Sequence, residues 1–116
     1  MQINTTGKNI ELTEAIKEYV DKKIGSLEKF HDKISLAHVI VGIENHHHQK
    51  GDVFVCECKL HLTGEDLFIS KTEQDLYKAI DKVRDHLEEE LKKHKTLQRE
   101  KDKRELRDNK EYKIEE

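Results

Sequence analysis

Nine lysines in two stretches of the chain have the residue type and the spacing to bind a polyanion. They are Lys22, Lys23, Lys29, Lys33, Lys78, Lys82, Lys92, Lys93 and Lys95. In the first stretch three of them repeat at +7 and +11 and so share one side of a helix, while in the second stretch two lie one turn apart and three close its end. Lysines that contact phosphates release counterions, so the pattern predicts a nucleic-acid surface. Pairing with carboxylates such as Asp81 and Glu89 is the alternative, and the spacing leaves it open.

The sequence contains no recognisable catalytic constellation. It has no glycine-rich phosphate loop, no nucleophile elbow and no helical pair of histidines with an intervening glutamate. Its many carboxylates fall on the polar faces of predicted helices, where a run of charge is usually solvated. We therefore predict that the protein is not an enzyme and has no small-molecule substrate.

Two groups of residues that often bind metals are interpreted without a metal. His46, His47 and His48 are adjacent in a polar connector, and adjacent residues cannot converge on one ion without a strained backbone. Cys56 and Cys58 lie two apart on the apolar face of a predicted strand, which is typical of a core. We predict no metal site and no cofactor, and keep a weak histidine site as the least favoured alternative.

The composition bounds the size and the compartment of the protein. A chain of 116 residues is one domain with room for a tail, and with 34% hydrophobic and 41% charged residues its core must be thin. It has no apolar run of about 18 residues that could cross a membrane, and its N-terminus lacks the features of a secretory signal. With two cysteines read as reduced thiols, we predict a cytoplasmic protein without membrane association. The net charge of −3 does not exclude nucleic acid, because the distribution of charge over a face decides binding.

The lysines are positioned by two predicted helices. Residues 72–95 form the clearest helix, with apolar residues at spacings of three and four, Thr72 as its N-cap and Asp75 completing a capping-box-like pair. A second helix is predicted over about residues 14–30 with Thr13 as its N-cap.

Four strands are predicted around these helices, at about residues 2–6, 35–44, 52–62 and 67–70. In the third strand apolar and polar residues alternate, which is typical of an antiparallel sheet with one covered and one wet face. The order β-α-β-β-β-α predicts an α+β two-layer domain, with both helices on one face of a four-stranded sheet. We assign this domain to residues 1–95. Residues 96–116 carry seven basic and seven acidic residues and few apolar ones, so we predict a charged, partly disordered tail.

Two segments of the chain resemble one protein family. The opening MQINTTGKNIELTEAIKEYVDKKIGSLEKF resembles the start of the ribosome hibernation promoting factors and ribosome-associated inhibitors, also called sigma-modulation proteins. The segment QDLYKAIDKVRDHLEEELKKHK resembles the second helix of that family. The likeness covers about residues 1–95, and two matched ends at the right separation are a specific signal. The chain is too short for the second domain of the long members, so it resembles the short form.

The resemblance implies a fold like a double-stranded-RNA-binding domain and a ribosomal function. Such proteins overlie the tRNA and mRNA positions in the decoding region of the small subunit, where they contact rRNA phosphates and keep idle ribosomes inactive in stress or stationary phase. The family's basic sites fall on Lys23, Lys29, Lys33, Lys93 and Lys95 of this chain. The implied partner is the ribosome, and we expect a monomer off it.

The chain also departs from the family pattern. Ser26 and His86 stand where the family often has lysine, and Glu89 stands where arginine is common. These positions, together with the acidic run at residues 88–90, motivate the alternative that the domain is a protein-interaction module that uses its long helix and charged tail. The tail looks more like that of the inhibitor branch, which opposes ribosome pairing.

Overall fold

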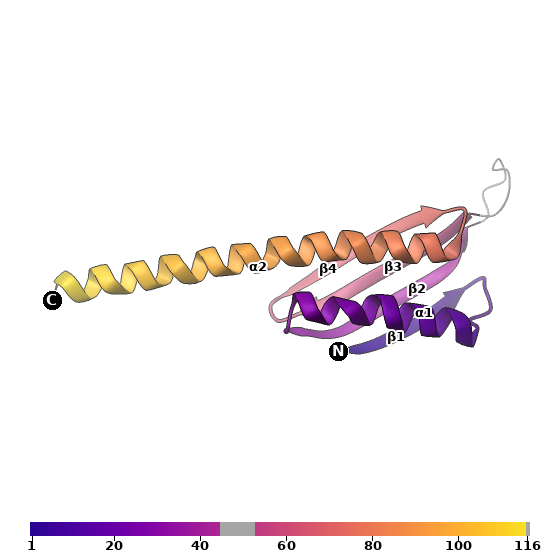
Figure 1. The fold of residues 1–116 in the computed structure, drawn as a ribbon, viewed down its shortest axis with the longest axis horizontal. Coiled ribbons are helices and arrows are strands. Elements are labelled where there is room, and N and C mark those ends of the chain that lie inside the picture. The colour runs from indigo at the N-terminus through magenta and orange to yellow at the C-terminus, as the bar shows by residue number, and fades with distance from the viewer. Residues whose placement is uncertain (45–52, 116) are drawn as a thin grey trace.

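The computed structural model describes the backbone of residues 1–44 and 53–115 and the side chains of residues 1–44 and 53–95. The predicted connector with His46, His47 and His48 lies outside these ranges. The elements follow the order β1 (Gln2–Lys8), α1 (Glu14–Gly25), a 3-10 helix η1 (Ser26–Phe30), β2 (Ile34–Glu44), β3 (Val53–Leu62), β4 (Glu65–Glu73) and α2 (Leu76–Glu115). The predicted order of helices and strands is therefore confirmed (Figure 1).

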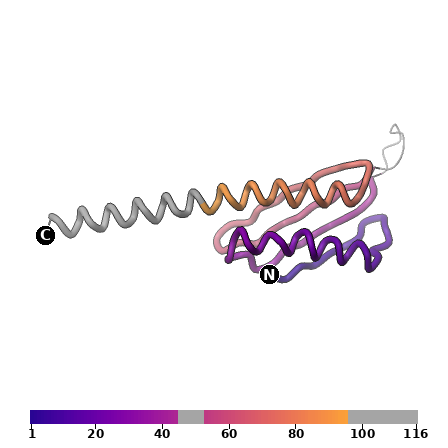
Figure 2. Tube along the Cα trace, in the orientation of Figure 1, coloured from indigo at the N-terminus to yellow at the C-terminus, as the bar shows by residue number. Residues whose placement is uncertain are grey.

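The four strands form one mixed sheet in the order β1-β2-β3-β4 (Figure 2). Strands β2, β3 and β4 are joined in antiparallel pairs, as expected from their alternating pattern. Strand β1 pairs with β2 in parallel, with Lys8 opposite Gly42. The antiparallel pairing expected from the alternation in the third strand therefore does not extend to this edge. Helix α1 lies between β1 and β2 in the chain and returns it in the same direction.

Both helices cover one face of the sheet and form a single core with it (Figure 1). Helix α1 and η1 bury Ile16, Val20, Ile24 and Leu27, while α2 buries a stripe at Leu76, Ile80, Val83, Leu87 and Leu91. The sheet contributes residues of β2 and β3, including both cysteines. The predicted α+β two-layer domain is confirmed, and its helix layer carries all nine candidate lysines except Lys33, which lies just beyond η1.

The two cysteines belong to this core, as predicted. Cys56 and Cys58 are fully buried and unpaired. Burial raises the pKa of each thiol to about 12, so both remain neutral near pH 7.

The starts of the helices were predicted with mixed success. The hydroxyl of Thr13 accepts from the backbone N–H of Ile16 at 3.3 Å and caps α1, as predicted. Thr72 does not cap α2, because β4 continues to Glu73 in its ladder with β3. The cap is Asp75, whose Oδ1 accepts from the N–H groups of Tyr77 at 2.8 Å and Lys78 at 3.3 Å.

The end of the first helix also differs from the prediction. Helix α1 stops at Gly25, and the chain tightens into η1 over Ser26–Phe30. The hydroxyl of Ser26 donates to the carbonyl of Lys23 at 2.6 Å, and such side-chain bonds compete with regular helical bonds. The tightening keeps Leu27 buried and leaves Lys29 exposed.

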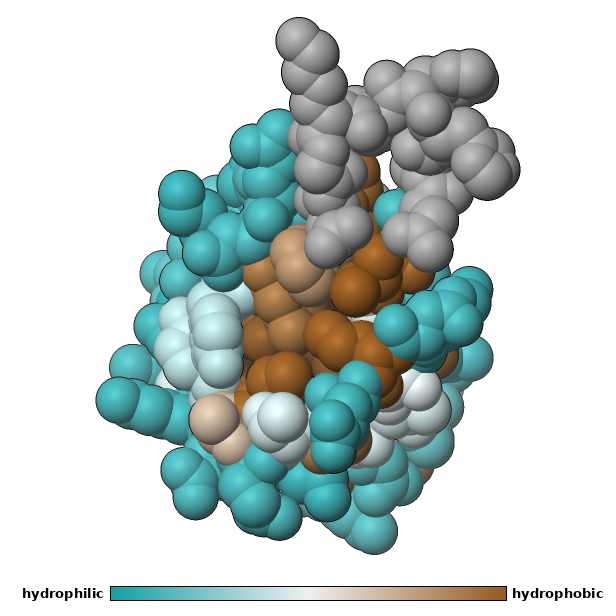
Figure 3. Space-filling model, turned by 90° about the vertical axis from the view of Figure 1, so that its right-hand side faces the viewer, coloured by the Kyte–Doolittle hydropathy of each residue, from teal (hydrophilic) through white to brown (hydrophobic). Residues whose placement is uncertain are grey.

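The core reaches the surface at one end of the molecule. Seen from that end, apolar side chains lie in the middle of a hydrophilic rim (Figure 3). Within the part of the chain that the structure describes, no helix is long and apolar enough to cross a membrane.

Candidate nucleic-acid interface

The first cation of the helix layer is held between α1 and α2. The hydroxyl of Tyr19 on α1 donates to Asp81 Oδ1 on α2 at 2.6 Å, and Lys23 Nζ lies 3.5 Å from the same oxygen. The ammonium is also 5.5 Å from the centre of the Tyr19 ring, which in turn meets Tyr77 edge-on at 4.7 Å. The hydrogen bond to Asp81 raises the pKa of Tyr19 to about 12. Lys23 therefore lies over the seam between the helices, beside a carboxylate of α2 and an aromatic ring of α1.

Three further cations surround one aromatic ring at the end of η1. The Phe30 ring centre lies 5.2 Å from Lys29 Nζ, 5.6 Å from the guanidinium carbon of Arg84 and 5.2 Å from Lys92 Nζ. Each distance is within the range of a cation–π contact. We call Phe30 with Lys29, Arg84 and Lys92 the Phe30 cluster. It brings together charges from two elements that are far apart in the sequence.

Arg84 is the site residue that sequence reasoning missed. Its Nε donates to the Ser26 hydroxyl at 3.2 Å, and its guanidinium also pairs with Glu88 at 2.9 Å and Asp85 at 3.2 Å. The only sequence signal was its place beside the apolar stripe at Val83. That place does not reveal which flank of the helix faces α1.

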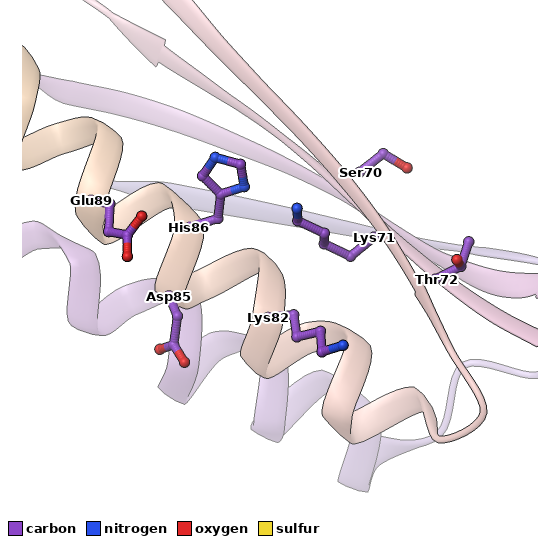
Figure 4. Close-up of a pocket in the computed structure, with 7 residues that line it drawn as sticks. All are labelled: Ser70, Lys71, Thr72, Lys82, Asp85, His86 and Glu89. Atoms are coloured by element: carbon purple, nitrogen blue, oxygen red, sulfur yellow. The ribbon is translucent and has the colours of Figure 1, made fainter.

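The remaining helical lysines do not all join this seam. Lys22 and Lys78 are exposed and make no ion pair with any residue whose side chain is described. Lys82 pairs with Glu73 of β4, and Lys93 lies 3.7 Å from Glu90. Lys82 thus lies on the flank of α2 that faces β4, away from α1 (Figure 4).

A shallow groove separates that flank from β4. It is lined by Ser70, Lys71, Thr72, Lys82, Asp85, His86 and Glu89. Lys71 and His86 point into the gap from opposite sides (Figure 4). The groove mixes charges of both signs. Among residues with described side chains, no three or more His, Cys, Asp or Glu gather where they could hold a metal ion.

The acidic run on α2 is largely paired. Glu88 binds Arg84 and lies 3.6 Å from Lys92, while Glu90 lies 3.7 Å from both His86 and Lys93. Glu89 is exposed on the groove side. Glu88 and Glu90 are therefore paired within α2. Of the three glutamates in this run, Glu89 alone has no ion-pair partner among the described residues.

Fold and charge pattern together define a small two-layer α+β domain with cations concentrated along the seam of its helix layer. The family model described as "Sigma 54 modulation protein / S30EA ribosomal protein" matches residues 3–99. The chain belongs to this family, as its two ends predicted.

Curated relatives and solved structures agree with this assignment. The chain is 38% identical over 95 residues to the ribosome hibernation promoting factor of Escherichia coli K12, covering 82% of this chain and 94% of the relative. It is 34% identical over 98 residues to the factor of the same name from Azotobacter vinelandii, with 84% and 86% coverage. The Thermus thermophilus Protein Y N-terminal domain is 30% identical, with a TM-score of 0.71, covering 81% of this chain and 99% of that one. A ribosomal subunit interface protein from Coxiella burnetii is 26% identical, with a TM-score of 0.70, and the match covers 83% of this chain and 99% of that one.

Proposed function

We propose that the protein is a ribosome hibernation factor that occupies the decoding region of the small subunit and blocks access of tRNA and mRNA. The observation that carries this proposal is the convergence of cations from both helices along one seam, at Lys23 and in the Phe30 cluster. The names of the relatives support the ribosome as the partner. The site of action is then the cytoplasm.

The proposed mechanism is occupation of a site without catalysis. Phosphate groups of rRNA contact the seam cations, and each contact releases counterions. Because A-form RNA presents mainly backbone and shape to a folded domain, ordered cations at fixed separations suit such recognition. The Phe30 ring and Asp81 hold these cations before binding, which lowers the entropy that binding must remove.

The structure also offers an answer to the departure at Ser26. A lysine there would place a positive charge beside α2, whereas in this chain the Arg84 guanidinium donates to the Ser26 hydroxyl from the neighbouring helix. A cation therefore lies next to position 26 although the residue at that position is neutral. We infer that Arg84 takes the place of the missing lysine, and arginine binds phosphate in a planar, two-pronged manner.

A second inference concerns the lysines that lie off the seam. Lys22 and Lys78 are exposed without ion pairs among the described side chains, so they are available to phosphates beside the seam. Lys82 and Lys93 are each paired with a carboxylate, and a phosphate would compete with that carboxylate. Lys23, Arg84 and Lys92 of the seam are paired with carboxylates as well. We rank the seam cations above Lys82 and Lys93 because cations from both sides of the helix layer converge there.

Co-sedimentation with purified small subunits at low and raised salt tests the proposal. The double variant Lys29→Glu with Lys92→Glu reverses two charges of the Phe30 cluster, and we expect at least a tenfold loss of affinity at low salt. The matched control reverses Lys17 and Lys59, which lie on the β1-facing flank of α1 and on the sheet. Wild-type and control proteins should bind alike, with affinity that falls as salt rises.

Two results would contradict the proposal. Equal loss in both double variants would mean that only total charge matters and that the seam is not the site. No binding by the wild-type protein at low salt would remove the ribosome as partner and leave a protein-interaction module built on α2.

A further inference from the structure

Two histidines that the proposed function does not use form an ordered hydrogen-bond chain. His31, just after η1, and His94, on α2, approach each other with 3.2 Å between Nε2 and Nδ1. The backbone N–H of Lys33 donates to His31 Nδ1 at 3.1 Å. At the other end, His94 Nε2 lies 2.7 Å from the carboxylate of Glu65, the first residue of β4. The chain connects three separate segments of the fold.

The directions of these bonds determine where the protons lie. Because Nδ1 of His31 accepts from a backbone N–H, the proton of the neutral ring is on Nε2, which then donates to Nδ1 of His94. His94 in turn carries its proton on Nε2 and donates it to Glu65. All three bonds are made only when both rings are neutral. A proton added to either ring removes at least one of them, and two charged rings would lie 3.2 Å apart.

A shared metal ion does not explain this geometry. The distance alone would allow a metal: two nitrogens bound to one tetrahedral zinc ion at about 2.0–2.1 Å lie only slightly farther apart than His31 Nε2 and His94 Nδ1. Coordination through Nε2 of His31 would, however, require the proton on Nδ1. Nδ1 could then no longer accept from Lys33.

The position of the chain places it inside the proposed RNA surface. His31 follows the Phe30 cluster directly, and Lys33 and Lys95 are close enough to act on its charge. Resting on the function proposed above, we propose that the His31–His94–Glu65 chain is a proton-linked element of the RNA surface. Within this chain, His31 stays uncharged in the free protein and takes up a proton when rRNA phosphates bind beside it.

The electrostatic surroundings of His31 support this direction. Burial lowers its pKa below the usual value, and a proton added to His94 would lower it further. The charged groups that face it from the elements around it are Asp32, Lys33, His94, Lys95 and, through His94, Glu65. Among the charged groups that act directly on His31, Asp32 raises the pKa of His31, whereas Lys33 and Lys95 lower it.

The sign of the pH effect follows from these groups. Phosphates that bind Lys33 and Lys95 cancel the charges that depress the pKa of His31, so this pKa rises in the complex. When the complex has the higher pKa, it holds more protons than its free components. Affinity therefore increases as pH falls through the pKa of the complex, and each unit of pKa rise gives about tenfold at most.

The test combines histidine NMR of the free protein with small-subunit binding at constant ionic strength between pH 8 and pH 6. In the free protein we expect both rings as Nε2–H tautomers and a pKa of His31 below the ordinary value of about 6.5. As the pH falls from 8 to 6, we expect the affinity of the wild-type protein for small subunits to rise about three- to tenfold more than the affinity of His31→Gln or His94→Gln. The matched control is His38→Gln, which alters the other imidazole pair, His38–His61, on the sheet.

The outcomes separate this inference from the function on which it rests. If wild-type protein binds at pH 8 but its pH dependence equals that of His31→Gln, the inference is wrong and the proposed function stands. If His38→Gln loses the pH dependence as well, the effect is not specific to the chain and the inference is again wrong. Absence of binding at every pH would overturn both the inference and the proposed function. Nδ1–H tautomers in the free protein would show that the hydrogen-bond chain does not exist as described, and the inference would be wrong.

Discussion

At the scale of single residues, the helix layer depends on a few contacts that connect α1 with α2. Asp81 is one of them, since it accepts from Tyr19 and attracts Lys23. Arg84 has a similar role on the next turn of α2, where it lies between Ser26 and Glu88. These residues position the cations of the seam, so their removal should affect both stability and binding.

The contact between Tyr19 and Asp81 gives the first prediction. Tyr19→Phe removes the donor and leaves Asp81 beside Lys23, and we expect a loss of about 0.5–1.5 kcal/mol in the free energy of unfolding. Urea unfolding measures this loss. Tyr77→Phe is the control, because it keeps the edge-on ring contact and no hydrogen bond of the Tyr77 hydroxyl is seen among the described residues. Equal losses in both variants would mean that the Tyr19 hydroxyl bond adds no stability.

At the scale of the elements, a strand and a cap decide where α2 begins. Strand β4 runs to Glu73 opposite Phe54 of β3, which leaves Gln74 and Asp75 as the link to the helix. The carboxylate of Asp75 then satisfies two of the free N–H groups of the first turn. The start of α2 in turn determines which of its flanks faces α1.

The cap of α2 gives the second prediction. Asp75→Ala leaves the first-turn donors without their partner, and we expect a loss of about 1 kcal/mol in stability. Thr72→Ala is the matched control, since Thr72 is exposed in β4 and makes no cap bond. Thermal and urea unfolding of the two variants distinguish the caps. A larger loss for Thr72→Ala than for Asp75→Ala would restore the cap expected from the sequence.

At the scale of the whole molecule, the buried cluster ends before the tail begins. The last buried residue within the described side chains is Leu91, and the other buried residues of its cluster lie in residues 16–87. Helix α2 continues to Glu115. The division into a domain over residues 1–95 and a charged tail over residues 96–116 remains a prediction.

Truncation after Lys95 tests this division. Because the core cluster lies within residues 16–91, we expect the shortened protein to keep its free energy of unfolding to within about 0.5 kcal/mol, the usual range for changes remote from the core. Urea unfolding of the full and shortened chains measures the difference. A loss of several kcal/mol would show that the tail packs on the domain.

Much of the architecture was predictable because it depends on local periodicity. The stripe from Leu76 to Leu91 and the alternation in β3 from Cys56 to Leu62 each reflect one element that buries one face, and both were confirmed. The alternation does not hold at Val55, which was expected on the solvent face and is buried. Thr13 was also predictable, since a cap involves only residues three apart in the chain. The family followed from two local segments at the right separation.

The errors and omissions involve contacts between residues that are far apart in the sequence. The parallel pairing of β1, the extension of β4 to Glu73 and the position of Lys82 against β4 all depend on a neighbouring element. Periodicity places a lysine on a helix face but does not identify what that face meets.

By itself, the sequence determined the order of the elements, the burial of the cysteines and the family. Only the tertiary structure decided which cations share a surface, because Arg84 joins Ser26 and Phe30 across 58 and 54 positions of chain. It likewise brought His31 to His94, 63 positions apart. Helical and strand patterns arise from interactions over a few residues, whereas a binding surface depends on how separate elements pack against each other.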